Sequence, residues 1–213
     1  ISACLVGSEM CIRDRLTSSS AGASAANRTA DPENRYYWRM NASRMEAQLL
    51  RDSLLHLAGE LDTAMGGSAL HPARDEASRR RSLYFFHSHN EYHRFLSMFD
   101  DASVLECYRR AQSIVPQQAL ALSNSRLALE TAARINAHLH DHLGNASDAA
   151  FVRAAFETVL CAAPTAAEQT ECEQVLVRLA ALLKKEARPD AVRRARGDLI
   201  QALLNHNDFI TIR

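Results

Sequence analysis

Apolar residues recur every three or four positions through most of the chain after residue 44. The first such segment carries Met45, Leu49, Leu50, Leu54, Leu57 and Leu61. This spacing places one apolar stripe along a helix. Ser43 and Glu46 stand three residues apart at its start, which fits a capping box. We therefore predict a helix at about residues 44–58, ending near Gly59.

The stretch Cys107–Ser125 is a junction between an irregular half and a helical half of the chain. It begins polar and arginine-rich, and Pro116 biases the two residues before it towards an extended conformation. Pro116 also suits the first position of a helix, and good helix formers follow it. We expect a helix to start at Pro116. We interpret Gln117 and Gln118 as architectural residues whose amides satisfy buried backbone groups.

Beyond residue 125 the pattern predicts a helical array. One helical face carries Leu127, Ile135, Leu139 and Leu143. It should stop at Gly144. Ser147 or Asp148 can cap the next helix, Thr165-Ala-Ala-Glu168 forms a second capping box, and Pro189 starts the last helix.

The first half of the chain is less regular. Residues 16–30 are small and polar and indicate a flexible lead-in. Tyr36, Tyr37 and Trp38 are most simply core anchors, with Trp38 in an architectural role. A long loop over residues 62–81 contains a glycine pair, a proline and three arginines.

The apolar run SLYFF at 82–86 is either an isolated strand or a buried extended arm, and Glu91–Phe99 fits a short helix capped by Asn90. The predicted fold class is mainly α. An irregular N-terminal half with long loops and at most one short extended arm should pack on a C-terminal helical array. We expect residues 31–213 to form a single domain.

Composition narrows the function classes. The chain has 213 residues, and its 25 Lys and Arg balance 25 Asp and Glu. The overall charge therefore does not attract the chain to nucleic acid or to an anionic membrane. No stretch approaches the roughly 20 apolar residues that span a bilayer. The five cysteines form no Cys-x-x-Cys pair, which argues against a disulfide framework or a structural zinc site.

Residues 1–15 stand apart from the rest. ISACLVGSEMCIRDR lacks the early basic region and uninterrupted apolar run of a signal peptide. The segment resembles a translated sequencing-adapter read that precedes unrelated reading frames. We therefore interpret it as a non-native artefact that says nothing about export.

Several stretches together resemble a known family. They are DPENRYYWRMNASRMEAQLLRDSLL, RRSLYFF, SIVPQQALALSN, AFETVLCAAPTAAE and DLIQALLNHNDFITI. They resemble, from about residue 31 to the end, the C-terminal domain of unknown function of planctomycete-type cytochrome c domain-containing proteins. The resemblance implies an exported, periplasmic or cell-surface multidomain protein of which this chain is a C-terminal fragment.

The resemblance further implies that a missing N-terminal cytochrome-c-like module carries haem c, since no position of this chain matches its haem-binding residues. It implies no cofactor in this fragment and no established catalytic residue. The upstream domains of the same protein are the first expected partners. A polysaccharide or a protein ligand is the second.

Two histidine groups could ligate a metal. His87, His89 and His93 surround Glu91 in an H-x-H-x3-H pattern. Imidazoles in such numbers can bind zinc, copper or iron, but a site needs three or four converging ligands. His138 and His142 lie one helical turn apart, with His140 between them. We favour surface or loop histidines in both groups and keep the first as a weak metal candidate.

Arginines and cysteines provide the remaining candidates. Arg80 and Arg81, with Arg109 and Arg110, could contact an anionic partner such as a sulfated polysaccharide. A solvated or salt-bridged face is the favoured alternative. Cys107 is interpreted as a buried structural thiol. Cys172 lies on an apolar stripe and is expected in the core.

The leading hypothesis is a non-catalytic module for assembly or ligand binding, because no convincing nucleophile, acid–base pair or cofactor loop emerges. One alternative is part of a polysaccharide-acting hydrolase or redox enzyme whose site is completed by upstream domains. Another is a metal-binding module on the histidine-rich arm.

Overall fold

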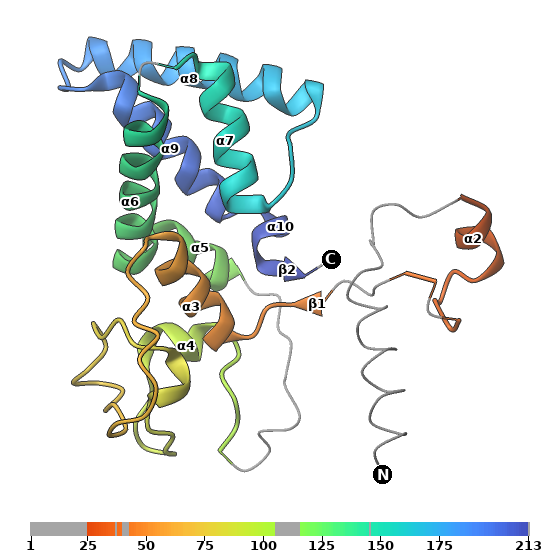
Figure 1. The fold of residues 1–213 in the computed structure, drawn as a ribbon, viewed down its shortest axis with the longest axis vertical. Helices are drawn as coiled ribbons and strands as arrows, with labels where there is room; N and C mark the ends of the chain where they lie inside the picture. The colour runs from red at the N-terminus through yellow and green to blue at the C-terminus, as the bar shows by residue number, and fades with distance from the viewer. Residues whose placement is uncertain (1–24, 37, 40–42, 105–115, 145, 213) are drawn as a thin grey trace. The chain divides into compact units, whose positions relative to one another are not determined.

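The computed structural model describes residues 25–36, 38–39, 43–104, 116–144 and 146–212 (Figure 1). The chain divides into two compact units. One contains the described residues up to Arg44 together with the end of the chain from Thr211, and the other spans Met45–Ile210. The described structure is mainly α, which confirms the predicted fold class.

The smaller unit is built around short local contacts. It contains helix α2 (Ala25–Ala30) and strand β1 (Ser43–Arg44), which pairs antiparallel with β2 (Thr211–Ile212). Asp31 is buried and orders the turn after α2, because its side chain accepts the Tyr36 N–H at 2.9 Å. This bond lowers the pKa of the Asp31 carboxyl. The Trp38 indole donates to the Asp31 carbonyl at 2.8 Å.

These positions correct part of the aromatic prediction. The Tyr36 side chain is 85% exposed and is not a core anchor, because its backbone N–H and not its ring makes the tertiary bond. Trp38 is half-buried, and its indole N–H donates to the Asp31 carbonyl, while its architectural role stays a prediction. Tyr37 lies outside the described residues.

The larger unit is a helical assembly. Its elements in chain order are α3 (Ala47–Leu57), the 3₁₀ turn η1 (Ser82–Tyr84), α4 (Arg94–Met98), α5 (Pro116–Asn124), α6 (Arg126–Leu143), α7 (Asp148–Leu160), α8 (Ala166–Lys185), α9 (Ala191–Leu204) and α10 (Asn207–Ile210). Figure 1 shows α9 running back among α6, α7 and α8. It therefore joins the C-terminal helices into one array.

The core of this unit follows from the apolar stripes of its helices. On α9 the buried face carries Ala195, Leu199, Ile200, Leu203 and Leu204. On α3, Leu50 and Leu54 are fully buried in the same apolar cluster as Ile135 of α6 and Phe151 of α7. By contrast, Leu176 is the only residue of α8 that is fully removed from solvent, so α8 lies at the edge of the array. Cys172 is half-buried and packs against the core.

Most predicted helix ends are confirmed. Ser147 caps α7, and Thr165 with Glu168 forms the capping box of α8. Gly144 ends α6 with a φ of 57°, a conformation that glycine adopts without steric cost. Pro116 is the first residue of α5, as predicted.

Two predicted caps and one predicted helix start are wrong. Pro189 lies in the turn before α9, which begins at Ala191. Ser43 belongs to β1, and α3 begins after Glu46 without a side-chain cap, because the chain is still paired as a strand at Arg44. The short helix α4 is capped by His93, not Asn90, because the Nδ1 atom of His93 accepts the Leu96 N–H.

The long loop predicted over residues 62–81 is confirmed as irregular. An isolated bridge between Asp62 and Arg80 joins its two ends, and a second bridge joins Leu70 in its middle to Phe85. The SLYFF segment starts as a 3₁₀ turn and becomes extended only at Phe85. The predicted extended arm is therefore a 3₁₀ turn followed by one residue, Phe85, in an isolated β-bridge. Ser82, the first residue of the turn, is buried.

Candidate functional site

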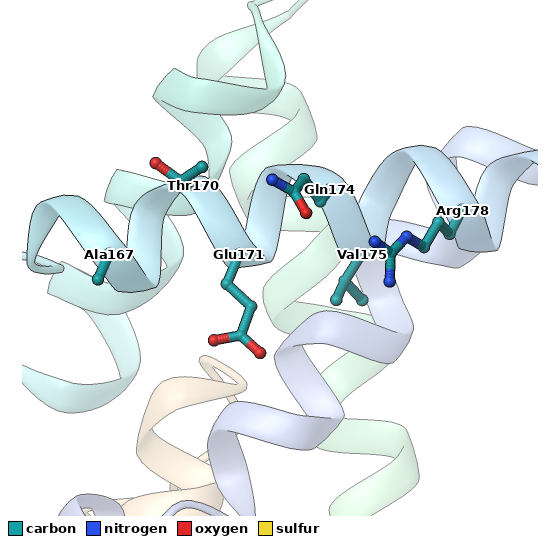
Figure 2. Close-up of a pocket in the computed structure, with 6 residues that line it drawn as sticks. All are labelled: Ala167, Thr170, Glu171, Gln174, Val175 and Arg178. Atoms are coloured by element: carbon teal, nitrogen blue, oxygen red, sulfur yellow. The ribbon is translucent and has the colours of Figure 1, made fainter.

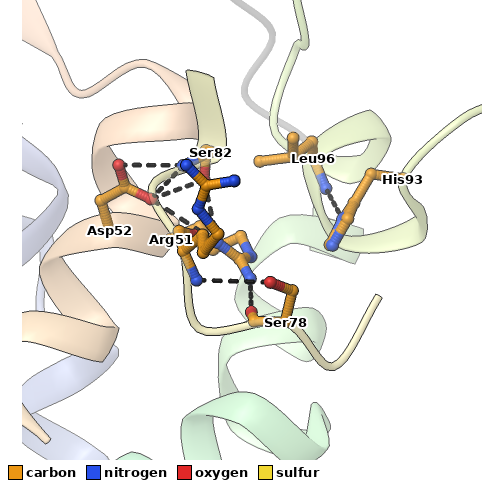
Figure 3. Close-up of polar contacts among 7 residues, drawn as sticks. Arg51, Asp52, Ser78, Ser82, His93 and Leu96 are labelled. Atoms are coloured by element: carbon orange, nitrogen blue, oxygen red, sulfur yellow. Dashed lines mark hydrogen bonds and ion pairs between the residues drawn. The ribbon is translucent and has the colours of Figure 1, made fainter. Parts of the chain in front are cut away.

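The most completely buried charged group described in the structure is Arg51, on the inner face of α3. Its side chain is 2% exposed. One guanidinium nitrogen donates to the Arg80 carbonyl at 3.0 Å and to the Ser82 hydroxyl at 3.2 Å, and the other donates to the Ser78 carbonyl (Figure 3). The guanidinium also lies 4.9 Å from the centre of the Phe85 ring. Arg51 thus ties the end of the long loop to α3.

Asp52 completes this cluster from the next position of α3. Its carboxylate accepts the Ser82 hydroxyl at 2.6 Å and the Ser82 N–H at 2.8 Å, and lies 3.6 Å from the Arg51 guanidinium. The buried hydroxyl of Ser82 donates to Asp52 and accepts from Arg51. Its bonds are therefore committed within the fold, and burial keeps it from solvent.

His93 lies beside the cluster at the start of α4. It is buried, packs 4.6 Å from the Phe85 ring, and uses Nδ1 to accept the Leu96 N–H. Burial, with the nearby Arg51 charge, lowers the pKa of His93 to about 4. A neutral imidazole therefore persists across the physiological pH range. No other described residue bonds to Nε2 in ordinary geometry.

The structure does not bring the first histidine group together as a ligand set. His87 is exposed and bonds through Nε2 to the Ala102 carbonyl at 2.9 Å, and His89 is exposed, whereas His93 is buried. Glu91, between them in sequence, pairs with His71 at 2.8 Å. Among the described residues, no group of three or more His, Cys, Asp or Glu side chains could hold a metal ion.

The three histidines of the second group differ in their exposure. His138 and His142 are exposed on α6, and His140 is half-buried near the end of that helix. His138 lies against Gly59, where a Cβ atom would come within 3.1 Å of its ring. The φ of 69° at Gly59, a conformation that side chains rarely adopt, is what favours glycine at this turn.

The candidate arginines are used differently from one another. Arg80 is half-buried, stacks 4.0 Å from the Tyr84 ring centre and donates to the carbonyls of Gly66 and Ser68. Arg80 therefore folds the loop onto itself. Arg81 is half-buried. Arg109, Arg110 and Cys107 lie outside the described residues.

Gln117 and Gln118 differ in their burial. Gln118 is buried in α5, and its amide donates to the Asp100 carboxylate at 3.2 Å. Gln117 is exposed, because consecutive side chains of an α-helix point about 100° apart and only Gln118 lies on the buried face. Asp101, next to Asp100, accepts the Gln48 amide at 2.5 Å. The two acids therefore brace α5 and α3.

Arg196, on α9, forms a second buried tie that the sequence analysis missed. Its guanidinium bonds to the Asp148 carboxylate at 2.7 Å and the Ala146 carbonyl at 3.0 Å, and lies 4.7 Å from the Phe151 ring centre. The signal was present in the sequence, because Arg196 falls between Ala195 and Leu199 on the apolar face of its helix.

Two surface hollows differ in how they are built. The six residues in Figure 2 all come from α8, and they are Ala167, Thr170, Glu171, Gln174, Val175 and Arg178. Residues of a single helix do not converge on a ligand, so we assign no site there. The other hollow, of about 470 Å³, is lined by residues of α6, α8 and α9.

Comparison with known proteins identifies the family. The family model PSD1, described as "Protein of unknown function (DUF1553)", matches residues 15–176, well over half of the chain. The chain belongs to this family. DUF1553 is a domain of unknown function related to planctomycete cytochrome-c-associated proteins. No curated protein and no solved structure matches the chain.

The DUF1553 match starts at residue 15 and ends within α8. The interpretation of residues 1–15 as an artefact stays a prediction. In the part of the chain that the structure describes, no helix is both long enough and apolar enough to cross a membrane.

Proposed function

We propose that this DUF1553 chain is a helical binding or assembly module without chemistry of its own. It would act at the C-terminal end of an exported, cytochrome-c-associated protein at the periplasmic or cell surface. Its partners would be the upstream domains and a polysaccharide or protein ligand. The family membership and the helical fold support this proposal.

One observation carries the non-catalytic part of the proposal. The residues that most resemble a reactive set are Arg51, Asp52, Ser82 and His93, and three of these four are fully buried. The Ser82 hydroxyl and the Asp52 carboxylate are bonded to each other and to backbone or guanidinium groups. A nucleophile needs access to substrate and a base free to take its proton. The Asp52 carboxylate lies within reach of the Ser82 proton, but the buried hydroxyl lacks access to substrate, so the cluster supports a structural role.

The proposal assigns haem only to an upstream module and not to this chain. Covalent haem c attachment uses a Cys-x-x-Cys-His sequence, and the five cysteines of this chain form none. The residues present therefore do not fit that group. Any electron transfer would involve an upstream module, with this chain providing contacts.

The experiment compares the purified chain with its Ser82→Ala and Asp52→Asn variants. Each is incubated with neutral and acidic polysaccharides while reducing ends and oxidation of a reduced dye are monitored. Thermal unfolding is recorded in parallel. We expect no turnover by any of the three, and lower melting temperatures for both variants. Turnover by the parent chain would refute the proposal, and its loss in Ser82→Ala without a lower melting temperature would assign the activity to this cluster.

A further inference from the structure

Helix α8 is the long helix that the rest of the described structure covers least. Of its 20 residues only Leu176 is fully buried, whereas the 14-residue α9 buries seven. Val177 and Leu182 of α8 are 64% and 55% exposed. The hollow in Figure 2 is lined by α8 alone, so it fits an elongated partner lying along this helix and not a small ligand.

The charged residues of α8 are divided between its two halves. The first half carries Glu168, Glu171 and Glu173 and no base, and the second half carries Arg178, Lys184 and Lys185 and no acid. Acids in the first turn of a helix and bases in its last turn are stabilised by the helix dipole. Glu171 and Arg178 lie outside those turns, so the dipole does not account for them.

Glu171 and Arg178 lie on the same side of α8, because seven residues make about two helical turns. They are about 10 Å apart along the helix axis, which is too far for an ion pair between them. Both side chains are exposed, and neither forms an ion pair with a described residue. Each therefore presents an unmatched charge on this side of the helix.

This side of α8 is complementary to itself when a second copy lies on it in the opposite direction. The midpoint between Glu171 and Arg178 lies between residues 174 and 175. A two-fold axis through that midpoint places Glu171 of each copy beside Arg178 of the other, which gives two ion pairs. The same axis places the exposed Leu182 opposite the small side chain of Ala167. In Figure 2, Glu171 and Val175 point to the same side of α8, so an apolar side chain lies next to the charged contact.

We infer that this face of α8 binds the same face of a second copy in antiparallel orientation. A second copy is the occupant that the pattern favours, because a two-fold interface needs matched charges and sizes at equal distances from one point. A 20-residue helix is about 30 Å long, and one helix pair makes a small interface, so we expect a weak, concentration-dependent dimer. The inference goes beyond the proposed function, because self-association needs neither an upstream domain nor a ligand.

The test is analytical ultracentrifugation of the whole chain over a range of concentrations, at low salt, where exposed ion pairs are least screened. We expect the average mass to rise with concentration from that of one chain towards that of two. Glu171→Arg and Arg178→Glu each replace both ion pairs by like-charge contacts, so each should weaken the dimer at least tenfold. Glu157→Arg is the matched control, because it makes the same charge change at an exposed residue of α7, and it should leave the dimer intact.

Mixing the two weakened variants is the decisive measurement. Every like-charge contact becomes an opposite-charge contact in the mixed pair, so Glu171→Arg and Arg178→Glu should dimerise together at concentrations where neither does alone. The double variant that carries both substitutions should dimerise like the parent, for the same reason. Recovery in the mixture requires that both variants are folded, and melting curves check this independently.

A parent chain that stays monomeric across the concentration range would overturn the inference. A dimer that survives both single variants would also overturn it, because another surface would then make the contact. Failure of the mixture to recover would do the same, since the losses would reflect surface charge in general and not this pairing. None of these results bears on the proposed function, because polysaccharide turnover is measured whether the chain is a monomer or a dimer.

Discussion

Substitution of Arg51 by methionine tests whether the long loop depends on the buried cluster. Arg51 donates to the carbonyls of Ser78 and Arg80 and to the Ser82 hydroxyl, at a position that is 2% exposed. Methionine fills much of the same volume but removes every one of these bonds. Losing one partner of a buried charged network costs about 3–5 kcal/mol. For a chain of this size, that corresponds to a fall in melting temperature of about 10 °C.

The assay is urea unfolding followed by circular dichroism, with Arg51→Lys and Arg126→Met beside the main variant. Arg51→Lys keeps the charge but loses the planar fork, so its stability should lie between those of the parent and Arg51→Met. Arg126 is a surface arginine paired with Glu130, and its removal should leave the midpoint nearly unchanged.

The Arg51→Met variant also has a local readout. It removes a positive charge from beside His93, so the pKa of His93 should rise from about 4. Nuclear magnetic resonance of the imidazole protons measures this directly. A loss below about 1 kcal/mol, with an unmoved His93 pKa, would refute the argument that Arg51 organises the loop.

Three further predictions concern pH, packing and capping. Because the folded pKa of His93 is about 4, below its ordinary 6.5, the unfolded chain binds more protons and stability should fall by about 3 kcal/mol as pH drops from 6.5 to 4. His93→Gln should flatten this slope in urea titrations while His89→Gln should not, and equal slopes would contradict the assignment. Leu54→Ala should cost about 2–5 kcal/mol in the same assay, and a cost below 1 kcal/mol would argue against its full burial. Thr165→Ala should cost about 1 kcal/mol and speed hydrogen exchange in the first turn of α8, and unchanged exchange would count against the capping box.

The helices were predictable because burial of one face imposes a period that the sequence displays. The capping boxes show the limit of local signals. Thr165 and Glu168 form one, whereas Ser43 lies in a strand that pairs with Thr211–Ile212. That pairing joins residues far apart in the chain. A local pattern cannot reveal it.

The buried polar ties were missed because arginine in a helix is usually interpreted as a surface residue. Arg51 lies four residues after Ala47 and four before Leu55, on the face that is buried. Its place within the apolar period is therefore the signal that it is internal. For the histidines the sequence pattern suggested a shared site that the structure does not form. His93 is buried and caps α4, whereas His87 and His89 are exposed.

The two buried arginines of the larger unit connect different elements, so their contributions to stability should be separable. Arg51 connects α3 with the loop that ends at Ser82, whereas Arg196 connects α9 with Asp148 at the start of α7. Sites that share no partner contribute additively to the unfolding free energy. The double variant Arg51→Met with Arg196→Met should therefore lose the sum of the two single losses in urea unfolding. A double loss that departs from this sum by much more than about 0.5 kcal/mol would show that the two sites are coupled, and the assignment of separate roles would then be wrong.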